Sequence, residues 1–231
     1  MPSRRRLFTA ILFLLVAAPS LHAQDTDATL PSPIALVLAK SPVIMPEASG
    51  DQIERITLSP QTVCPDLHLP APVGDAWTLT FWVRLNDTPA LLRTDYSRNA
   101  PVTLADFSTA GQADTRRLVI RVQGGKFSVT EQNAGKWKAL SGFSATAAPD
   151  TWHFLAYTRN ASAGTFYLNG DISLRTTGTV SSSDQLQTLA LGNFYKQRRL
   201  DGIILQPRLY RQVLTAEQIR IRYRDRPAGT R

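Results

Sequence analysis

TWHFLAYTRNASAGTFYLNGDISLRTT, residues 151–177, is the stretch that decides the fold. Two runs within it, residues 152–158 and 165–168, are rich in the aromatic and β-branched residues that favour strands. The mostly small and polar residues between them, 159–164, include a glycine and predict a hairpin loop. Asn169-Gly170 then tolerates the positive φ of a tight two-residue turn, and alternation resumes beyond it. The stretch therefore predicts three consecutive antiparallel strands.

WTLTFWVRL, residues 77–85, is the strongest strand signal elsewhere in the chain. Side chains alternate between the two faces of a strand, so one face would be apolar and the other half polar. The apolar set, which we expect in the core, is Trp77, Leu79, Phe81, Val83 and Leu85. The other set, which we expect on the outer surface of one sheet, is Thr78, Thr80, Trp82 and Arg84.

Further strand signals recur along the chain, separated by turns and without a sustained helical period. They cover residues 53–58, 89–95, 102–108, 117–123, 126–132, 136–143, 186–192, 200–205 and 208–213. Gly124-Gly125 marks another two-residue hairpin turn. Residues 214–223 predict a short helix with Thr215 as its N-cap. The predicted fold class is all-β, a two-sheet antiparallel jelly-roll sandwich with a short C-terminal helix.

Three of these regions contain short motifs that, taken together, match the pattern of one protein family. They are Phe81-Trp82-Val83; Trp152, His153, Tyr167, Asn169 and Gly170; and Leu191, Gly192, Gly202, Ile204, Arg208, Leu209, Tyr210, Leu214, Thr215 and Ile219. Together they resemble laminin-G-like, pentraxin-type jelly-roll domains of the concanavalin A-like lectin/glucanase superfamily. The resemblance extends over about residues 53–223 and implies a concanavalin A-like sandwich.

Two departures from the family pattern affect the closing strand. Leu205 stands where the family has Asp, and Pro207 stands where it has Val. Proline lacks an N–H donor, so Pro207 makes this strand either an edge strand or a bulged one. The family often holds calcium through oxygens of rim loops, and Leu205 removes one acidic ligand. Asp201 with Asn193 could contribute to a calcium site or could hydrogen-bond the turn before Gly202, so no cofactor is predicted.

The N-terminal residues have the pattern of a secretory signal. Residues 1–23 combine three arginines, a short apolar core and a small-residue exit. The apolar core is too short for a bilayer, which needs about 20 residues. We therefore expect a secreted or periplasmic protein, with an uncleaved membrane anchor as the alternative. Residues 24–50 would be a Pro-rich extended leader, part of which could join a sheet, and residues 51–231 would form the jelly-roll domain.

Charge and cysteine content limit the partners. Removal of residues 1–23 lowers the formal net charge of +8 by three, and no run of five basic residues occurs, so we predict no nucleic-acid partner. The remaining surplus is compatible with an acidic polysaccharide or an anionic cell surface, and also with a merely well-solvated surface.

Cys64 is the one cysteine, so no intramolecular disulfide can form. Val63 and Pro65 beside it favour a buried, inert thiol over a reactive one.

Catalytic groups are not evident in the sequence. Glycoside hydrolysis needs two carboxylates across the sugar bond, and no Glu-x-Asp-x-x-Glu or similar cluster occurs. Glu131 and Asp171 are single acids that we interpret as solvated turn or edge residues. His22, His68 and His153 cannot form a metal triad, because His22 belongs to the signal segment. We predict that the chain is not an enzyme, and a glycosidase with an unrecognised site is the remaining catalytic alternative.

Ligand binding is predicted at loops on the rim of the sandwich. Residues 193–199, NFYKQRR, combine aromatic rings that could stack on a sugar with basic groups that could hydrogen-bond an acidic glycan or a polar peptide. The alternative is a solvated loop with Phe194 folded inward. The candidate ligand-binding residues are Tyr195, Lys196, Arg198, Tyr96, Arg98 and Trp82.

Trp82 has two interpretations. It could stack on a sugar from the outer face of its strand, or it could pack as part of the fold. As a whole, the sequence predicts a secreted, non-catalytic binding module that recognises carbohydrate or another surface polymer through rim loops. The alternative is a structural or adhesion protein that binds another protein through residues 24–50 or a sheet edge.

Overall fold

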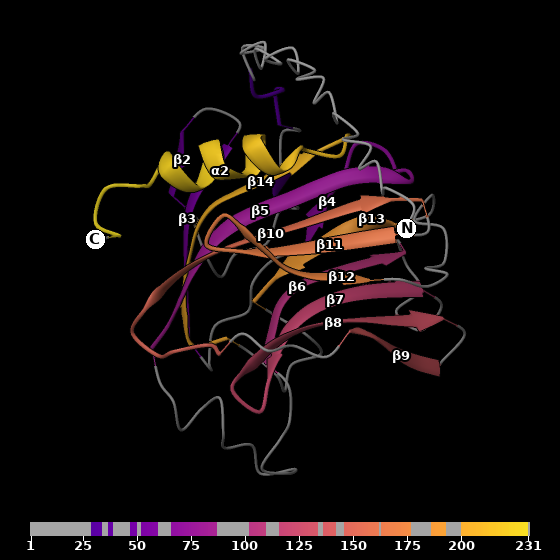
Figure 1. The fold of residues 1–231 in the computed structure, drawn as a ribbon, viewed down its shortest axis with the longest axis horizontal. Helices are drawn as coiled ribbons and strands as arrows, with labels where there is room; N and C mark the ends of the chain where they lie inside the picture. The colour runs from indigo at the N-terminus through magenta and orange to yellow at the C-terminus, as the bar shows by residue number, and fades with distance from the viewer. Residues whose placement is uncertain are drawn as a thin grey trace, which may run out of the picture.

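The computed structural model describes residues 29–33, 37–38, 47–49, 52–59, 66–86, 102–109, 116–133, 136–141, 146–161, 163–176, 186–192 and 200–230. In these residues two seven-stranded antiparallel sheets pack face to face, which confirms the predicted all-β sandwich (Figure 1). Sheet 1 consists, in spatial order, of β1 (Val37–Leu38), β4 (Leu67–His68), β13 (Leu186–Leu191), β6 (Val102–Thr109), β7 (Arg116–Gln123), β8 (Lys126–Asn133) and β9 (Lys136–Ser141). Sheet 2 consists of β12 (Asp171–Thr176), β11 (Ala163–Leu168), β10 (Trp152–Asn160), β5 (Ala76–Leu85), β14 (Gly202–Tyr210), β3 (Gln52–Leu58) and β2 (Glu47–Ser49).

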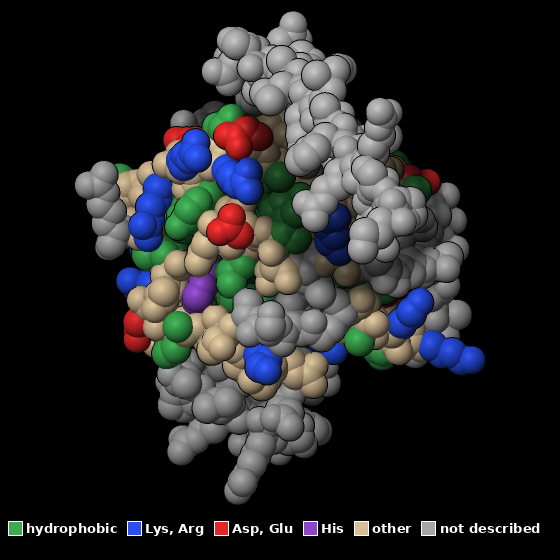
Figure 2. All heavy atoms as spheres, in the orientation of Figure 1, with side chains coloured by type: hydrophobic (Ala, Val, Ile, Leu, Met, Phe, Trp, Pro, Cys, Tyr) green, Lys and Arg blue, Asp and Glu red, His purple; other side chains and the backbone are tan. Residues whose placement is uncertain are grey.

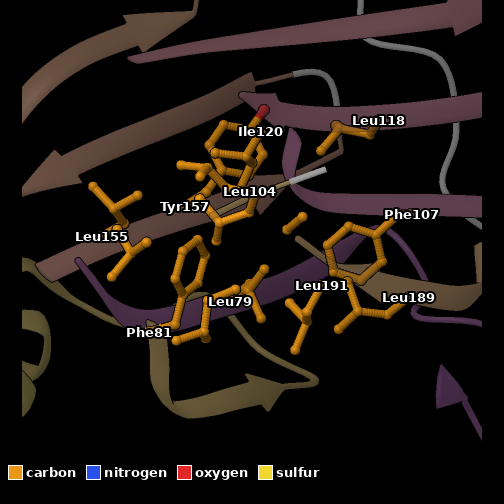
Figure 3. Packing of buried hydrophobic residues seen from close by; sticks show 14 of the residues in the cluster. Leu79, Phe81, Leu104, Phe107, Leu118, Ile120, Leu155, Tyr157, Leu189 and Leu191 are labelled. Atoms are coloured by element: carbon orange, nitrogen blue, oxygen red, sulfur yellow. The ribbon is translucent and has the colours of Figure 1, made fainter. Parts of the chain in front are cut away.

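The core lies between the sheets, where alternate side chains of both layers meet (Figure 3). The predicted core face of β5 is confirmed, since Trp77, Leu79, Phe81, Val83 and Leu85 are all buried. Trp77 packs on Phe107 of sheet 1 with ring centroids 4.7 Å apart, and so joins the two layers. Each such side chain contributes roughly 1.5–3 kcal/mol by leaving water, so this core is the main source of stability.

The first central hairpin is tighter than predicted. β10 and β11 remain paired as far as Asn160 and Ala163, so the ladder includes most of the segment 159–164 that we expected to be a loop. Ala161 takes the positive φ of 45° that the short turn requires. The prediction was wrong because Arg159, a residue that usually marks a solvated loop, is buried and pairs with Trp77 of β5.

The closing strand is one element rather than the two predicted for residues 200–205 and 208–213. β14 runs without a break, and its register against β5 shifts between Leu205 and Arg208. Gln206 has a positive φ of 46° in this bulge. Because β14 lies between β5 and β3, Pro207 does not mark an edge strand, and the bulge alternative is the one that forms.

A short helix, α2 (Ala216–Arg224), closes the described chain as predicted. The hydroxyl oxygen of Thr215 accepts a hydrogen bond from the backbone N–H of Gln218, at 3.2 Å. The Gln218 side chain in turn accepts one from the Thr215 N–H, at 3.0 Å. This capping box satisfies two backbone donors that the first turn would otherwise leave unpaired.

The outer face of sheet 2 is not the solvent-facing surface that we expected, because α2 lies across it (Figure 1). Thr78, Thr80 and Trp82 are buried; Thr78 bonds to Gln212 and Leu214 just before the helix, and Trp82 stacks on Tyr223 of the helix. A second apolar cluster forms there from β5, β10, β11, β14 and the helix, and its members are Trp82, Phe154, Ala156, Tyr167, Ile203, Leu205, Tyr210, Leu214 and Ile219. The helix was predicted, but its docking position was not.

Residues from the predicted leader take part in both sheets. β1 pairs with β4 in sheet 1, and β2 pairs with β3 at the end of sheet 2. Gln218 of α2 donates a hydrogen bond from Nε2 to the carbonyl oxygen of Thr29, at 3.1 Å. The predicted signal segment 1–23, the predicted strand 89–95 and Cys64 lie outside the described residues. Among the described helices, none has the length and apolar character needed to cross a bilayer.

Candidate ligand-binding rim

One end of the sandwich is held by hydrogen bonds between segments far apart in the chain. β5 ends at Leu85, which lies opposite Gly202 at the start of β14. The next residue, Asn86, donates from its backbone N–H to the carbonyl oxygen of Asp201, at 3.0 Å. Its side-chain Nδ2 also donates to Asp201 Oδ1, at 3.0 Å. These two bonds clamp the end of β5 to the start of β14.

A second pair of bonds ties β13 to β6 and to the approach to β14. The Gly192 N–H donates to the Leu104 carbonyl at 2.8 Å, and the Leu200 N–H donates to the Gly192 carbonyl at 2.9 Å. Gly192 has a φ of 69°, and a Cβ at this position would overlap the Leu58 side chain. A residue with a side chain would therefore disturb the turn. We call the residues around these bonds, Leu85, Asn86, Leu104, Gly192, Leu200, Asp201 and Gly202, the rim.

The predicted ligand-binding residues on the two loops lie outside the described residues. Tyr96 and Arg98 belong to segment 87–101, which follows Asn86, and Tyr195, Lys196 and Arg198 belong to segment 193–199, which follows Gly192. Three of the described residues that flank these segments, Asn86, Gly192 and Leu200, lie at the rim. Asn86 bonds to Asp201, and Leu200 bonds to Gly192.

Trp82 lies away from solvent, at 1% exposure. Its ring is 5.3 Å from that of Phe154 and 5.6 Å from that of Tyr223, which stacks on it at an interplanar angle of 24°. The guanidinium carbon of Arg226 lies 5.1 Å from the same ring. A ring enclosed in this way has no face open to a sugar, so the structure favours the packing alternative for Trp82.

The two single acids have different environments. Asp171 is 84% exposed, as predicted. Glu131 is buried in β8, so the prediction of a solvated position was wrong for this residue. Glu131 lies opposite Leu118, whose side chain belongs to the core, and this register turns the carboxylate inward. Burial lowers the pKa of Arg159, and the Glu131 charge is one of the influences that oppose that shift.

Asp106 and Arg117 form a buried ion pair on adjacent strands of sheet 1. Arg117 Nε donates to Asp106 Oδ1 at 3.2 Å, and a second guanidinium nitrogen contacts Oδ2. Burial raises the pKa of Asp106 from 3.8 to about 6, although the hydrogen bond from Arg117 opposes the rise. We interpret the pair as structural, because the guanidinium occupies both carboxylate oxygens.

Metal binding finds no support in the described part of the chain. Its residues include no group of three His, Cys, Asp or Glu side chains placed to hold a metal ion. Asp201 Oδ1 accepts a hydrogen bond from the Asn86 amide at the end of β5, and Asn193, its partner in the calcium alternative, lies outside the described residues. His153 is buried, with Nε2 3.2 Å from the carbonyl oxygen of Ala148, and burial lowers its pKa.

Sequence reasoning did not single out two partly exposed tryptophans. Trp137 is 45% exposed in β9, at the end of sheet 1, between the exposed side chains of Lys136 and Lys138. A tryptophan between two lysines in a short strand was a sequence signal from which an exposed position for Trp137 could have been predicted. Trp152 is partly buried at the start of β10, where the sequence indicated only a family motif.

The structure is similar to several solved protein domains. The binding domain of botulinum neurotoxin serotype D has 16% identity and a TM-score of 0.54, covering 75% of this chain and 43% of that chain. Domain 4 of AbnA, a GH43 extracellular arabinanase from Geobacillus stearothermophilus, in complex with arabinotriose, has 16% identity and a TM-score of 0.53, covering 74% and 89%. The botulinum neurotoxin serotype D ligand binding domain in complex with N-acetylneuraminic acid has 14% identity and a TM-score of 0.50, covering 70% and 40%.

These likenesses show the fold alone, since fold does not determine function. This chain spans less than half the length of the toxin domains that it matches. No curated protein sequence matches it. The laminin G family model described as the concanavalin A-like lectin/glucanases superfamily matches residues 60–220, well over half of the 231 residues. The chain therefore belongs to the concanavalin A-like lectin/glucanases superfamily.

Proposed function

We propose that this chain is a secreted or periplasmic, non-catalytic module that binds carbohydrate through loops at the rim. The observation that carries the proposal is the clamp between Asn86 and Asp201. It holds Asn86, the residue before segment 87–101, against Asp201, which follows segment 193–199 by two residues. The two segments with the sequence features of a glycan site therefore leave the sandwich from the same place.

The chemistry of these segments suits a sugar that carries negative charge. Tyr195 and Tyr96 supply rings that can stack on the apolar C–H face of a pyranose. Lys196, Arg198 and Arg98 supply charge-assisted donors for carboxylate or sulfate oxygens. An acidic glycan is therefore the ligand class that the proposal favours.

Two of the structural relatives support carbohydrate as the ligand class. One was solved with arabinotriose and another with N-acetylneuraminic acid, a sugar that bears a carboxylate. Their presence among the similar structures supports the proposal without assigning those ligands to this chain.

Several observations favour binding without catalysis. The similar solved structures include a binding domain and a ligand binding domain of botulinum neurotoxin and domain 4 of an arabinanase. Among the described acids, Glu54 and Asp225 each pair with an arginine. A paired carboxylate is poorly suited to donate a proton to a leaving group. Export is supported by the charged, apolar and small-residue pattern of residues 1–23.

A glycan array tests the proposal. We expect the purified chain to retain acidic glycans, with binding that weakens as salt is raised because charge-assisted contacts are screened. The double change Tyr195→Ala with Lys196→Ala should lower retention about tenfold or more without a large change in melting temperature. Lys136→Ala, an exposed lysine in β9, serves as the matched control and should bind as the wild type does. If the chain bound no glycan on the array and a protein co-purified with it in stoichiometric amount, the result would instead support the protein-binding alternative.

A further inference from the structure

A pocket of about 300 Å³ lies on the outer face of sheet 2, apart from the rim. Its walls come from β3, β14, the start of β10 and the C-terminal segment, and its lining residues include Glu54, Arg55, Trp152, Leu205, Gln206 and residues 227–229. Leu205 is three residues along β14 from Gly202, or about 10 Å from the rim. A volume near the lower end of the range for ligand pockets suits a single sugar ring.

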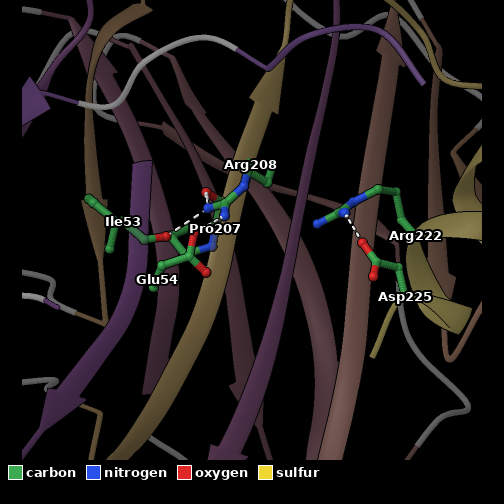
Figure 4. A network of polar contacts seen from close by, with 6 residues as sticks. All are labelled: Ile53, Glu54, Pro207, Arg208, Arg222 and Asp225. Carbon is green, nitrogen blue, oxygen red and sulfur yellow. Dashed lines mark hydrogen bonds and ion pairs between the residues drawn. The ribbon is translucent and has the colours of Figure 1, made fainter. Parts of the chain in front are cut away.

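The pocket is built by the bulge in β14. The register shift after Leu205 and the positive φ of Gln206 turn this part of the strand out of the regular ladder. Arg208 then fixes the neighbouring strand, because it donates to the Ile53 carbonyl at 2.7 Å and pairs with Glu54 (Figure 4). A non-glycine residue with positive φ typically costs about 1–3 kcal/mol, and such strain often accompanies function.

Trp152 gives the pocket an aromatic wall. Unlike Trp82, Trp152 is only partly buried, and its ring has the guanidinium carbon of Arg84 at 5.6 Å from the centroid. Arg84 and Trp152 are register partners on adjacent strands. An aromatic ring beside a cation can take the apolar face of a sugar and an acidic substituent of the same sugar together.

Two buried polar atoms at this surface lack partners among the described residues. They are Gln206 Oε1, in the lining, and Arg84 Nε, beside Trp152. A buried acceptor or donor without a hydrogen bond costs about 1–3 kcal/mol. The acceptor matches a sugar hydroxyl, and the donor matches a carboxylate oxygen.

Two arginines, Arg224 and Arg226, lie on the other side of residues 227–229 from the pocket. A second pocket of about 580 Å³ shares these residues and is lined by Arg224 and Arg226. Arg226 contacts Trp82 and Thr230, and its described neighbours include no carboxylate within ion-pair distance. Figure 2 shows Lys and Arg side chains interspersed with acidic ones around the helix and the C-terminal segment at the upper left.

We propose that the pocket at the β14 bulge binds a carboxylate-bearing pyranose, as one unit of an acidic polysaccharide that continues past residues 227–229. Trp152 contacts the ring, Gln206 Oε1 accepts from a hydroxyl, and Arg84 binds the carboxylate. This second site extends the proposed function, and it uses none of the rim residues.

Isothermal titration calorimetry with trigalacturonate tests the pocket, and the fully methyl-esterified trimer provides the same rings without charge. The variants are Gln206→Gly, in which glycine accepts the positive φ, and Arg84→Gln. Lys136→Gln in sheet 1 is the charge-matched control. We expect the wild type and the control to bind trigalacturonate, each pocket variant to bind about tenfold more weakly, and the ester to bind more weakly than the acid. Melting curves of all variants establish that they are folded.

Unchanged affinity in folded Gln206→Gly and Arg84→Gln would overturn the pocket assignment. So would a wild-type chain that binds no trigalacturonate or that binds the ester equally well. If the Tyr195→Ala, Lys196→Ala variant lost this binding while both pocket variants kept it, the ligand would belong to the rim. That result would contradict the pocket and leave the proposed function standing.

Discussion

Tyr223 of α2 stacks on Trp82 of β5, with ring centroids 5.6 Å apart and an angle of 24° between the planes. This contact, with Phe154 beside both rings, attaches the helix to the outer face of sheet 2. The fold therefore has two apolar layers, one between the sheets and one under the helix.

Tyr223→Ala should destabilise the protein by about 3–4 kcal/mol, because it removes a large aromatic side chain from the layer under the helix. Urea unfolding followed by tryptophan fluorescence measures the change. Val213→Ala, at a 38% exposed position just before the helix, is the matched control and should cost less than about 1 kcal/mol. Equal losses in the two variants would mean that the helix does not depend on the Trp82 contact.

Thr215→Ala should cost about 1 kcal/mol, because it removes the hydroxyl that accepts from the Gln218 N–H. Thr215→Ser keeps that oxygen and should retain most of the stability. Thermal unfolding of the two variants is the check. A serine variant as unstable as the alanine variant would show that the cap does not carry the effect.

Gly202→Ala should be severely destabilising, by several kcal/mol. A Cβ at this position would overlap the backbone carbonyl of Arg84, which a rigid central strand cannot move aside. Gly124→Ala is the comparison, since a Cβ there meets nothing within 4 Å and only the positive φ of 58° opposes it. Its expected cost is about 1 kcal/mol. The order of the two losses in denaturant unfolding tests the position of β14 between β5 and β3.

Asp106 should make stability fall as pH rises from about 4 to about 6. Its pKa is 3.8 without the fold and about 6 in it, so between these values the native state holds a proton that the unfolded state has lost. The resulting loss is at most about 3 kcal/mol and is complete above pH 6. Asp106→Asn has no proton to lose. The difference in unfolding free energy between wild type and variant should therefore shift by about that amount across the window, and a constant difference would contradict the raised pKa.

Strands were predictable where period-two alternation coincided with aromatic and β-branched residues. That is why β5, β10 and the two Gly-containing turns at Gly124-Gly125 and Asn169-Gly170 were placed correctly. Arg159 misled the prediction, because a buried arginine extends a strand that composition assigned to a loop. Alternation also could not tell which outer face the helix would cover, so Trp82 and Trp152 were not distinguished as buried and partly exposed.

The two candidate sites also differ in how far the sequence predicted them. The family pattern included Gly192 and Gly202, and the structure shows that both lie at the rim. The pocket at Gln206 could not be predicted, because it depends on a register shift and on the C-terminal segment packing beside β3. Pro207 did indicate that a bulge could form, but not what the bulge would line.

The most direct test of rim recognition is an NMR titration of the isotopically labelled chain with an acidic oligosaccharide retained on the array. We expect the backbone amides of Asn86, Gly192, Leu200 and Asp201 to shift together and saturate with one affinity, while those of β9 do not move. Saturable binding that leaves all four amides unshifted would contradict it.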